Sequence, residues 1–347
     1  MTQDKPQEGD QDSRDPTGER AAGGPETGGQ ESGRDSAGTP AAAAGDSGQM
    51  DTATGSGGTA SATDPAAGDA GVADDGVAAG AKGAAGESSP ATPTASAYDR
   101  FAKFWWRGLL AALGFFTRLP VRAPAMPLSE ATRTFPLVGA IVGLIGLLAY
   151  ALALRLGLSV LLAAVLAIAA TAAVTGALHE DGLADLADML GVRGGRERKL
   201  AVMRDSTIGS YGVLTLVIAT LFKIGAIADL AVLPQVASAM ISAHVLSRAV
   251  LPVVMRSLPL ARPNGLAVHA GKPPADGMYW ALGLGIVIVL LVGGPGAAIV
   301  ATVSALVTAF LVAKLAQRHI GGYTGDVLGA IEQVVEVAVL INFVTFS

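Results

Sequence analysis

The chain has 347 residues, of which 51% are hydrophobic and 15% charged, and its formal net charge is −5. The mean hydropathy of +0.48, which already includes a very polar first quarter, excludes an ordinary soluble globular domain for the remainder. The absence of cysteine excludes disulfides, thiolate zinc sites and cysteine nucleophiles, so any bound metal must use oxygen or imidazole ligands.

Residues 1–97 contain no Leu, Ile, Phe, Trp or Tyr and hold 16 acidic residues against 5 basic ones. Such a composition cannot build a hydrophobic core, so we predict a disordered cytoplasmic tail rich in Gly, Ala, Ser, Pro and Asp. The opening MTQDKPQEGD is acidic and precedes no apolar run, so we expect neither a secretory signal nor a transit peptide. Residues 98–347 form the predicted membrane-embedded domain.

A helix predicted over residues 101–119 precedes the first apolar run. Its sequence interleaves Lys103 and Arg107 with several Phe and Trp residues. This pattern is typical of a helix that lies in the headgroup region of a bilayer. We expect it to rest on the cytoplasmic surface.

The fold class predicted for the remainder is an all-α integral membrane protein with about seven transmembrane helices. Crossing the hydrocarbon core takes about 20 apolar residues. The fifth and sixth runs are short and separated by Gly293-Gly294-Pro295-Gly296, so they form either a helical hairpin or one broken element. The predicted spans lie near 135–155, 158–178, 208–229, 235–255, 278–293, 296–313 and 327–345.

The basic residues of the loops predict the orientation, because Lys and Arg accumulate on the cytoplasmic side. Loops on one side contain nearly all of them, and the other side receives only Arg155. The prediction is a multi-pass protein of the cell inner membrane, with a cytoplasmic amino terminus, an external carboxy terminus and its functional groups on the cytoplasmic face.

Three aspartates follow the second span in the sequence HEDGLADLADML. Asp181, Asp185 and Asp188 lie at i, i+4 and i+7, which places them within roughly a 60° arc of a helix. Their charges repel one another unless a cation lies between them, and hard oxygen ligands select ions such as Mg²⁺. The alternative is a solvated acidic helix end.

Cations with less obvious partners occur further along the chain. Arg204 lies in a basic loop that suits anion capture, although basic loops are also expected from the topology alone. Lys223 and Arg248 lie inside predicted spans, so each must face a protein partner or a wet cavity. The alternative for both is structural pairing without a direct functional role.

The last span begins with GGYTGDVLGAIEQ. Thr324 and Asp326 can cap its helix, and the glycines permit close backbone approach. Glu332 and Glu336 lie below the expected membrane surface, where carboxylates are costly. Capping does not explain these two residues.

Four motifs in this order, HEDGLADLADML, RERKLAVMRDSTIGSYG, SRAVLPVVMRSLPLARPNGL and GGYTGDVLGAIEQ, closely resemble the cobalamin synthase (adenosylcobinamide-GDP ribazoletransferase) family. The resemblance covers about residues 105 to 345. It implies transfer of cobinamide phosphate from adenosylcobinamide-GDP to α-ribazole or its 5′-phosphate. The implied products are GMP and adenosylcobalamin or its 5′-phosphate, with Mg²⁺ required.

The resemblance and the residue patterns together assign the site. Phosphoryl transfer needs positioning, a metal bridging the pyrophosphate, and cations for the developing charge. The predicted Mg²⁺ ligands are Asp181, Asp185, Asp188 and Asp326; the predicted substrate and phosphate contacts are Arg204, Lys223, Arg248, Thr324 and Glu332; the predicted catalytic residues are His179, Asp181, Asp185 and Asp188, with His179 or a carboxylate accepting the hydroxyl proton.

Two rival functions remain open from sequence. A CDP-alcohol phosphotransferase also uses aspartates at a cytoplasmic helix end, but its pattern has Ala-Arg where this chain has Asp185-Leu186. A secondary transporter would place charges near the membrane midplane, whereas these carboxylates cluster at one face. The bilayer is an expected partner and nucleic acid is not, and the small residues of 158–178 allow packing against another copy of the chain.

Overall fold

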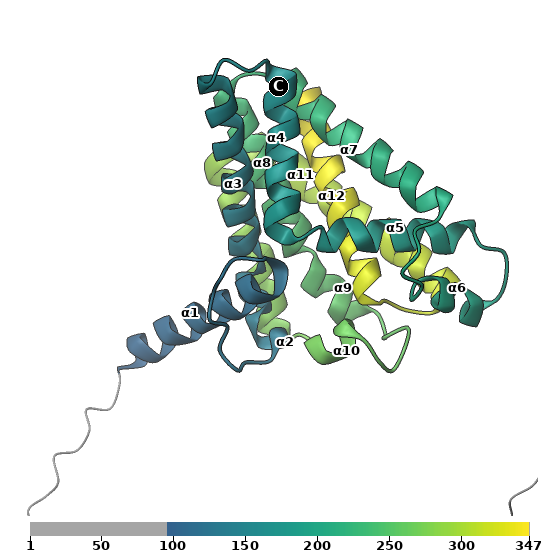
Figure 1. The fold of residues 1–347 in the computed structure, drawn as a ribbon. Helices are drawn as coiled ribbons and strands as arrows, with labels where there is room; N and C mark the ends of the chain where they lie inside the picture. Colours follow the sequence, from purple (N-terminus) through teal and green to yellow (C-terminus); the bar gives the residue numbers. More distant parts are fainter. Residues whose placement is uncertain (1–95, 347) are drawn as a thin grey trace, which may run out of the picture. The chain divides into compact units, whose positions relative to one another are not determined.

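The computed structural model describes residues 96–346, so the predicted tail over 1–97 lies almost entirely outside them. The described residues form helices and no β-strand, as predicted (Figure 1). The helices are α1 (Ala97–Phe116), α2 (Leu128–Ala131), the 3-10 helix η1 (Thr132–Thr134), α3 (Phe135–Arg155), α4 (Val160–Thr175), α5 (Leu178–Gly191), α6 (Arg196–Val202), α7 (Ser210–Leu230), α8 (Leu233–Ala249), α9 (Leu251–Ser257), α10 (Leu266–Ala270), α11 (Ala275–Ile320) and α12 (Gly325–Thr345).

The chain is a multi-pass membrane protein. Within residues 96–346, five helical segments are long and apolar enough to cross a bilayer, and α4 with α5 adds a sixth if that bent pair is one broken span. Each of the seven predicted spans overlaps one of these five segments or the bent pair of α4 and α5. Seven spans correspond to six structural units because two predicted spans fall within the long helix α11. The five segments are Leu128–Arg155, Ser210–Leu230, Leu233–Ser257, Ala275–Ile320 and Gly325–Thr345.

Gly294 divides α11 into two helices. Its backbone has φ 79° and ψ 175°, which no helical residue adopts, and Pro295 follows it. Glycine tolerates this conformation because it has no Cβ, and proline cannot continue the preceding helix. The two halves correspond to the predicted spans 278–293 and 296–313.

Both ends of α11 lie beside α9 and the loop that follows it, which decides between a hairpin and a single broken element. Before the helix, Arg256 donates to the carbonyl of Pro273 at 3.0 Å. After it, the backbone N–H of Ala261 donates to the carbonyl of Tyr323 at 2.9 Å. The halves of α11 therefore form a helical hairpin.

Small residues bring α3 and α8 into close contact. Gly139 and Gly143 form a GxxxG pattern on α3, and the backbone of α8 passes directly over them. A Cβ on Gly143 would lie 3.1 Å from the Cα of Ile241, and one on Gly139 would collide with the carbonyl of His244. Membrane helices pack in this way where no bulky side chain separates their backbones. The contact fixes the polar residues of α8 inside the bundle.

The helix α1 confirms the predicted helix ahead of the first span, although it begins at Ala97. Ser96 caps it, because the hydroxyl of Ser96 accepts from the N–H of Asp99 and the carboxylate of Asp99 accepts from the N–H of Ser96. Trp105 packs edge-on against Trp280 of α11, with 5.5 Å between ring centroids. Figure 1 shows α1 projecting away from the bundle at one end.

A sharp bend separates α5 from α4. Gly176 and Ala177 both adopt left-handed backbone conformations, with φ 65° and φ 56°. The axes of the two helices differ by 92°, and Figure 1 shows α5 running across the neighbouring helices. The predicted span 158–178 therefore ends at Thr175, and the aspartate motif lies on a separate helix.

Candidate active site

Two glycines bring α5 against α12 and join the first and last sequence motifs. A Cβ on Gly182 would lie 2.6 Å from the backbone oxygen of Asp326, and one on Gly329 would lie 3.2 Å from the Cα of His179. Only hydrogen at these positions permits so close an approach. The contact sets the carboxylates of α5 beside the amino-terminal turn of α12.

The four predicted metal ligands lie on the two helices that form this contact, three on α5 and one in the first turn of α12. Asp181 is exposed, and Asp185 and Asp326 are half-buried. The charge on Asp185 is repelled by Asp326, Asp181 and Asp188, and it is attracted by Arg262. An oxygen-rich cluster with this excess of negative charge has the chemistry of a Mg²⁺ site.

Asp188 is held differently. One of its carboxylate oxygens accepts from the N–H of Gly209 at 2.7 Å, and the other accepts from the N–H of Gly212 at 2.8 Å. Both donors lie at the amino terminus of α7, whose first N–H groups have no partner within the helix. A capping role therefore competes with the ligand role predicted for Asp188.

The amino terminus of α12 is organised around Asp326. The hydroxyl of Thr324 donates to the Asp326 carboxylate at 3.1 Å and accepts from the N–H of Val327 at 3.3 Å, as the capping prediction requires. Arg262 forms an ion pair with the same carboxylate at 3.3 Å. Among the described residues, the second terminal nitrogen of Arg262 is buried without a hydrogen-bond partner.

Further arginines from the basic loops converge near Arg262. Arg204, a predicted phosphate contact, donates to the side chain of Asn264 at 3.0 Å. Arg196 donates to the carbonyl of Ala261 at 2.6 Å. Sequence reasoning assigned no site role to Arg262 or Arg196, because only the fold brings their separate loops together.

Two titratable groups near these loops lie outside the spans. A hydrogen bond from the hydroxyl of Thr207, with a second from its N–H, holds the pKa of Asp205 below its ordinary value. Burial raises the pKa of Tyr323, so its phenol stays neutral at physiological pH. Neither residue is among the predicted site residues.

Glu332 is fully buried and accepts several hydrogen bonds. Arg248 pairs with one of its oxygens at 2.6 Å, and Ser247 donates to the same oxygen at 3.0 Å. Gln333 donates to the other oxygen at 3.0 Å, and the Nδ1 atom of His179 lies 3.7 Å from it. Arg248 and Glu332 were predicted to contact substrate, but the structure pairs them with each other.

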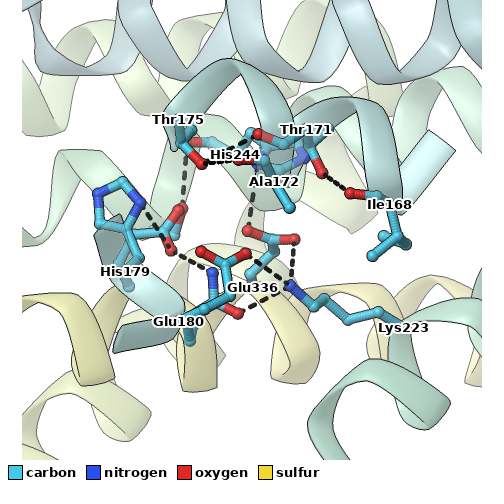
Figure 2. Close-up of polar contacts among 12 residues, drawn as sticks. Ile168, Thr171, Ala172, Thr175, His179, Glu180, Lys223, His244 and Glu336 are labelled. Carbon is cyan, nitrogen blue, oxygen red and sulfur yellow. Dashed lines mark hydrogen bonds and ion pairs between the residues drawn. The ribbon is translucent and has the colours of Figure 1, made fainter. Parts of the chain in front are cut away.

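Lys223 is likewise engaged by protein groups. Its ammonium lies 3.3 Å from Glu336 and 4.0 Å from Glu180, and donates to Gln333 at 2.8 Å (Figure 2). His244 pairs with the other oxygen of Glu336 at 3.2 Å. The phosphate role predicted for Lys223 finds no support here, because the residue is buried among carboxylates.

The same region contains a second arrangement with metal-ligand chemistry. His244, Glu332 and Glu336 each offer a ligand atom, and these atoms lie within 4.8 Å of one another. Arg248 and Lys223, however, already neutralise the two glutamates. The arrangement is therefore a buried ion-pair network that ties together α5, α7, α8 and α12.

His179 lies between this network and a pocket. Its ring stacks on Phe116, with 5.6 Å between centroids and 24° between planes. The side chain is 3% exposed, and among the described residues its Nε2 atom has no hydrogen-bond partner. One ring nitrogen thus lies beside Glu332, a ring face stacks on Phe116, and the other nitrogen has no hydrogen-bond partner among the described residues.

The pocket has a volume of about 100 Å³ and lies where α5 and α12 meet. Most of its wall is apolar, and its polar side chains are His179, Asp181 and Asp326. The remaining lining residues are Phe115, Phe116, Leu128, Phe135, Leu178, Leu251, Met255, Leu266, Ala267, Ala270, Gly325, Leu328 and Gly329. This is the one pocket among those described that contains predicted metal ligands.

Comparison with known proteins gives one clear match. Residues 108–344 match the family model described as cobalamin-5-phosphate synthase. This range contains every predicted site residue and leaves the acidic tail outside. No solved structure gives a significant match.

Curated relatives extend the match. A protein of Bradyrhizobium diazoefficiens is 45% identical over 240 residues, which cover 68% of this chain and 92% of the relative. A protein of Pseudomonas aeruginosa is 42% identical over 245 residues, covering 68% and 96%. One of Shewanella amazonensis is 41% identical over 242 residues, covering 66% and 92%. All three are named adenosylcobinamide-GDP ribazoletransferase.

Proposed function

The chain belongs to the cobalamin-5-phosphate synthase family, and from that membership we propose that it is an adenosylcobinamide-GDP ribazoletransferase like its named relatives. The enzyme acts at a late step in the assembly of the cobalamin nucleotide loop. The observation that carries the proposal is the α5–α12 contact, where two carboxylates and a histidine with an unpartnered ring nitrogen line one pocket.

The reaction is a phosphoryl-type transfer. A ribose hydroxyl oxygen of α-ribazole, or of its 5′-phosphate, attacks the phosphorus that bears cobinamide. The bond from that phosphorus to the bridging oxygen of the pyrophosphate breaks, and GMP leaves with the bridging oxygen. The hydroxyl proton passes to a base on the protein. Catalysis of such a transfer rests on positioning and on stabilisation of the charge on the phosphate oxygens.

Mg²⁺ fits the acidic part of the site. Asp181, Asp185 and Asp326 would supply oxygen ligands, and their mutual repulsion would be relieved by a bound cation. When bound, the ion would neutralise phosphate oxygens of the donor. Asp188 would act beside them, chiefly by anchoring α7 to α5.

Arginines of the loops are the best candidates for holding the pyrophosphate. The guanidinium of Arg262 already lies at Asp326 and has an unpartnered terminal nitrogen. Arg204 and Arg196 lie on the neighbouring loop and helix. Guanidinium groups bind phosphate oxygens in a bidentate manner, which suits them to orient the donor.

His179 is the best candidate for the base. His179 lines the pocket and its Nε2 atom has no hydrogen-bond partner among the described residues, while Glu332 lies beside Nδ1 and favours the tautomer with its proton on that nitrogen. A neutral imidazole with a free Nε2 can accept the hydroxyl proton. Phe116 keeps the ring in place by stacking on it.

We propose that the site lies at the cytoplasmic face of the cell membrane. The loops that contain Arg196, Arg204 and Arg262 belong to the basic side of the chain, and basic loops favour the cytoplasmic side. Both substrates carry polar sugar or phosphate groups, so a site at this face needs no transport step across the bilayer.

The test is product formation by the purified full chain in liposomes. With adenosylcobinamide-GDP, α-ribazole and Mg²⁺, we expect GMP and a cobalamin product in equal amounts by mass spectrometry, and neither product with EDTA. Asp185→Asn should lower turnover by about 100-fold or more, because a ligand of the reacting metal is lost. Asp229→Asn, an exposed aspartate on α7, is the matched control and should keep full activity.

Two outcomes would contradict parts of the proposal. Folded protein that forms neither product would exclude the transferase function. Full Mg²⁺-dependent turnover by Asp185→Asn would remove that residue from the metal site while leaving the function intact.

A further inference from the structure

The pocket beside His179 has a wall of aromatic rings. Phe115 and Phe116 pack edge-on, with 5.0 Å between centroids, and Phe116 packs edge-on against Phe135 at 4.7 Å. The imidazole of His179 stacks on Phe116 in the same group. Flat aromatic ligands bind such walls well, because they can stack on faces and contact ring edges.

Leu251, Met255, Leu266, Ala267 and Ala270 complete the apolar surface from α9 and α10. The polar groups are confined to the side formed by α5 and α12. A ligand in this pocket therefore needs an apolar body and a polar end directed toward Asp181 and Asp326.

The polarity of the pocket distinguishes between the two substrates. Its wall is mostly apolar, and its polar side chains lie on one side. A nucleoside can direct a flat bicyclic base to the apolar wall and its ribose to the polar side. Adenosylcobinamide-GDP, with its corrin ring, adenosyl group and side chains, is several times larger than a nucleoside and carries many amides that an apolar wall would leave without partners.

We propose that this pocket binds the acceptor, with the aromatic base of α-ribazole among Phe115, Phe116, Phe135 and Met255. The proposal rests on the transferase function and adds the location of one substrate to it. The ribose then points toward α5 and α12, where its hydroxyl meets Nε2 of His179. The donor lies outside the pocket, along the arginines of the loops.

The direct test uses the unmodified protein. A ribazole analogue with a photoreactive azide on its benzimidazole ring is illuminated with the full chain in liposomes, and the labelled peptides are identified by mass spectrometry. We expect labelling on α1, α3, α9 or α10, with at least tenfold less label in excess α-ribazole. Protectable label confined to other helices would overturn the proposal.

A kinetic test asks whether filling the pocket weakens the binding of the acceptor alone. Ala267→Leu and Ala270→Leu fill the pocket, so the KM for α-ribazole should rise about tenfold or more while the KM for the donor stays unchanged. Ala169→Leu, on the exposed face of α4, adds the same side chain elsewhere and should change neither constant. A rise in the donor KM alone would place the donor in the pocket and contradict the proposal.

The two levels of inference fail separately. A wild-type protein that forms cobalamin product but takes up label elsewhere has the proposed function and a different acceptor site. A protein labelled in the pocket that forms no product binds the riboside but does not catalyse the proposed transfer.

Discussion

Asp188 illustrates how one side chain can suit two roles. Its spacing from Asp181 and Asp185 predicts a metal ligand, and all three carboxylates do lie on one helix. In the structure, however, both of its oxygens accept N–H groups at the start of α7. The spacing fixes only the face of the helix, and it cannot tell which residues on that face meet another helix.

Asp188→Asn separates the two roles. An amide offers one acceptor oxygen, so one of the two hydrogen bonds to α7 is lost, at a cost of about 1 kcal/mol in the free energy of unfolding. We expect a lower Tm in detergent and an unchanged Mg²⁺ concentration for half-maximal activity. The matched variant is Asp181→Asn, which alters an exposed carboxylate and should shift the Mg²⁺ dependence with little change in Tm. The reverse pattern at Asp188 would make it a ligand.

Lys223 and Arg248 show that sequence can predict the need for a partner without identifying the partner. Their positions inside apolar spans predict that each needs a partner, and the structure gives both of them glutamates. The partners are distant in sequence, and no spacing rule links residue 248 to residue 332. The phosphate role predicted for the same two residues is not supported by this pairing, because their charges are already neutralised by glutamates.

Contacts between whole helices decide where the site forms. Hydropathy predicts the long spans well, since their length and apolar character are local properties. It does not predict the 92° bend before α5, because that bend depends on two left-handed residues, one of which is alanine. The sequence therefore predicts the site motifs but not the way in which α5 turns to meet α12.

Gly182→Ala tests the contact between these two helices. The added Cβ would lie 2.6 Å from the backbone oxygen of Asp326, so α5 must move away from α12. We expect turnover to fall by about tenfold or more, because displacements of about 1 Å are costly in a positioned site. Gly225→Ala is the control, since a Cβ there meets nothing within 4 Å. Full activity of Gly182→Ala in folded protein would show that the contact does not position the site.

At the scale of the whole molecule, the basic loops and the hairpin of α11 predict which helix ends lie on the same side of the membrane. The chain contains no cysteine, so a single introduced thiol gives an unambiguous signal. Leu158 lies between α3 and α4, and Gly195 lies at the start of α6 in the basic region. These two positions should face opposite sides of the membrane.

Labelling of Leu158→Cys and Gly195→Cys with a membrane-impermeant maleimide checks this topology. In intact cells we expect labelling at position 158 and, at position 195, labelling only after permeabilisation, because positively charged loops stay in the cytoplasm. Neither change introduces a clash, since Leu158 is exposed and a Cβ at Gly195 meets nothing within 4 Å. Labelling of residue 195 in intact cells would reverse the proposed orientation.

The buried ion pairs connect the stability of the bundle to the chemistry of the site. Glu332→Leu leaves Arg248 buried without its carboxylate. We expect the free energy of unfolding to fall by about 3–5 kcal/mol, the usual cost of breaking a buried ion pair. Adding Arg248→Met removes the unpaired charge, so the Tm of the double variant should recover much of the loss. Turnover should not recover with it, because His179 still lacks the carboxylate beside its Nδ1 atom. Recovery of both quantities together would reduce Glu332 to a packing role, whereas recovery of Tm alone would establish that it positions His179.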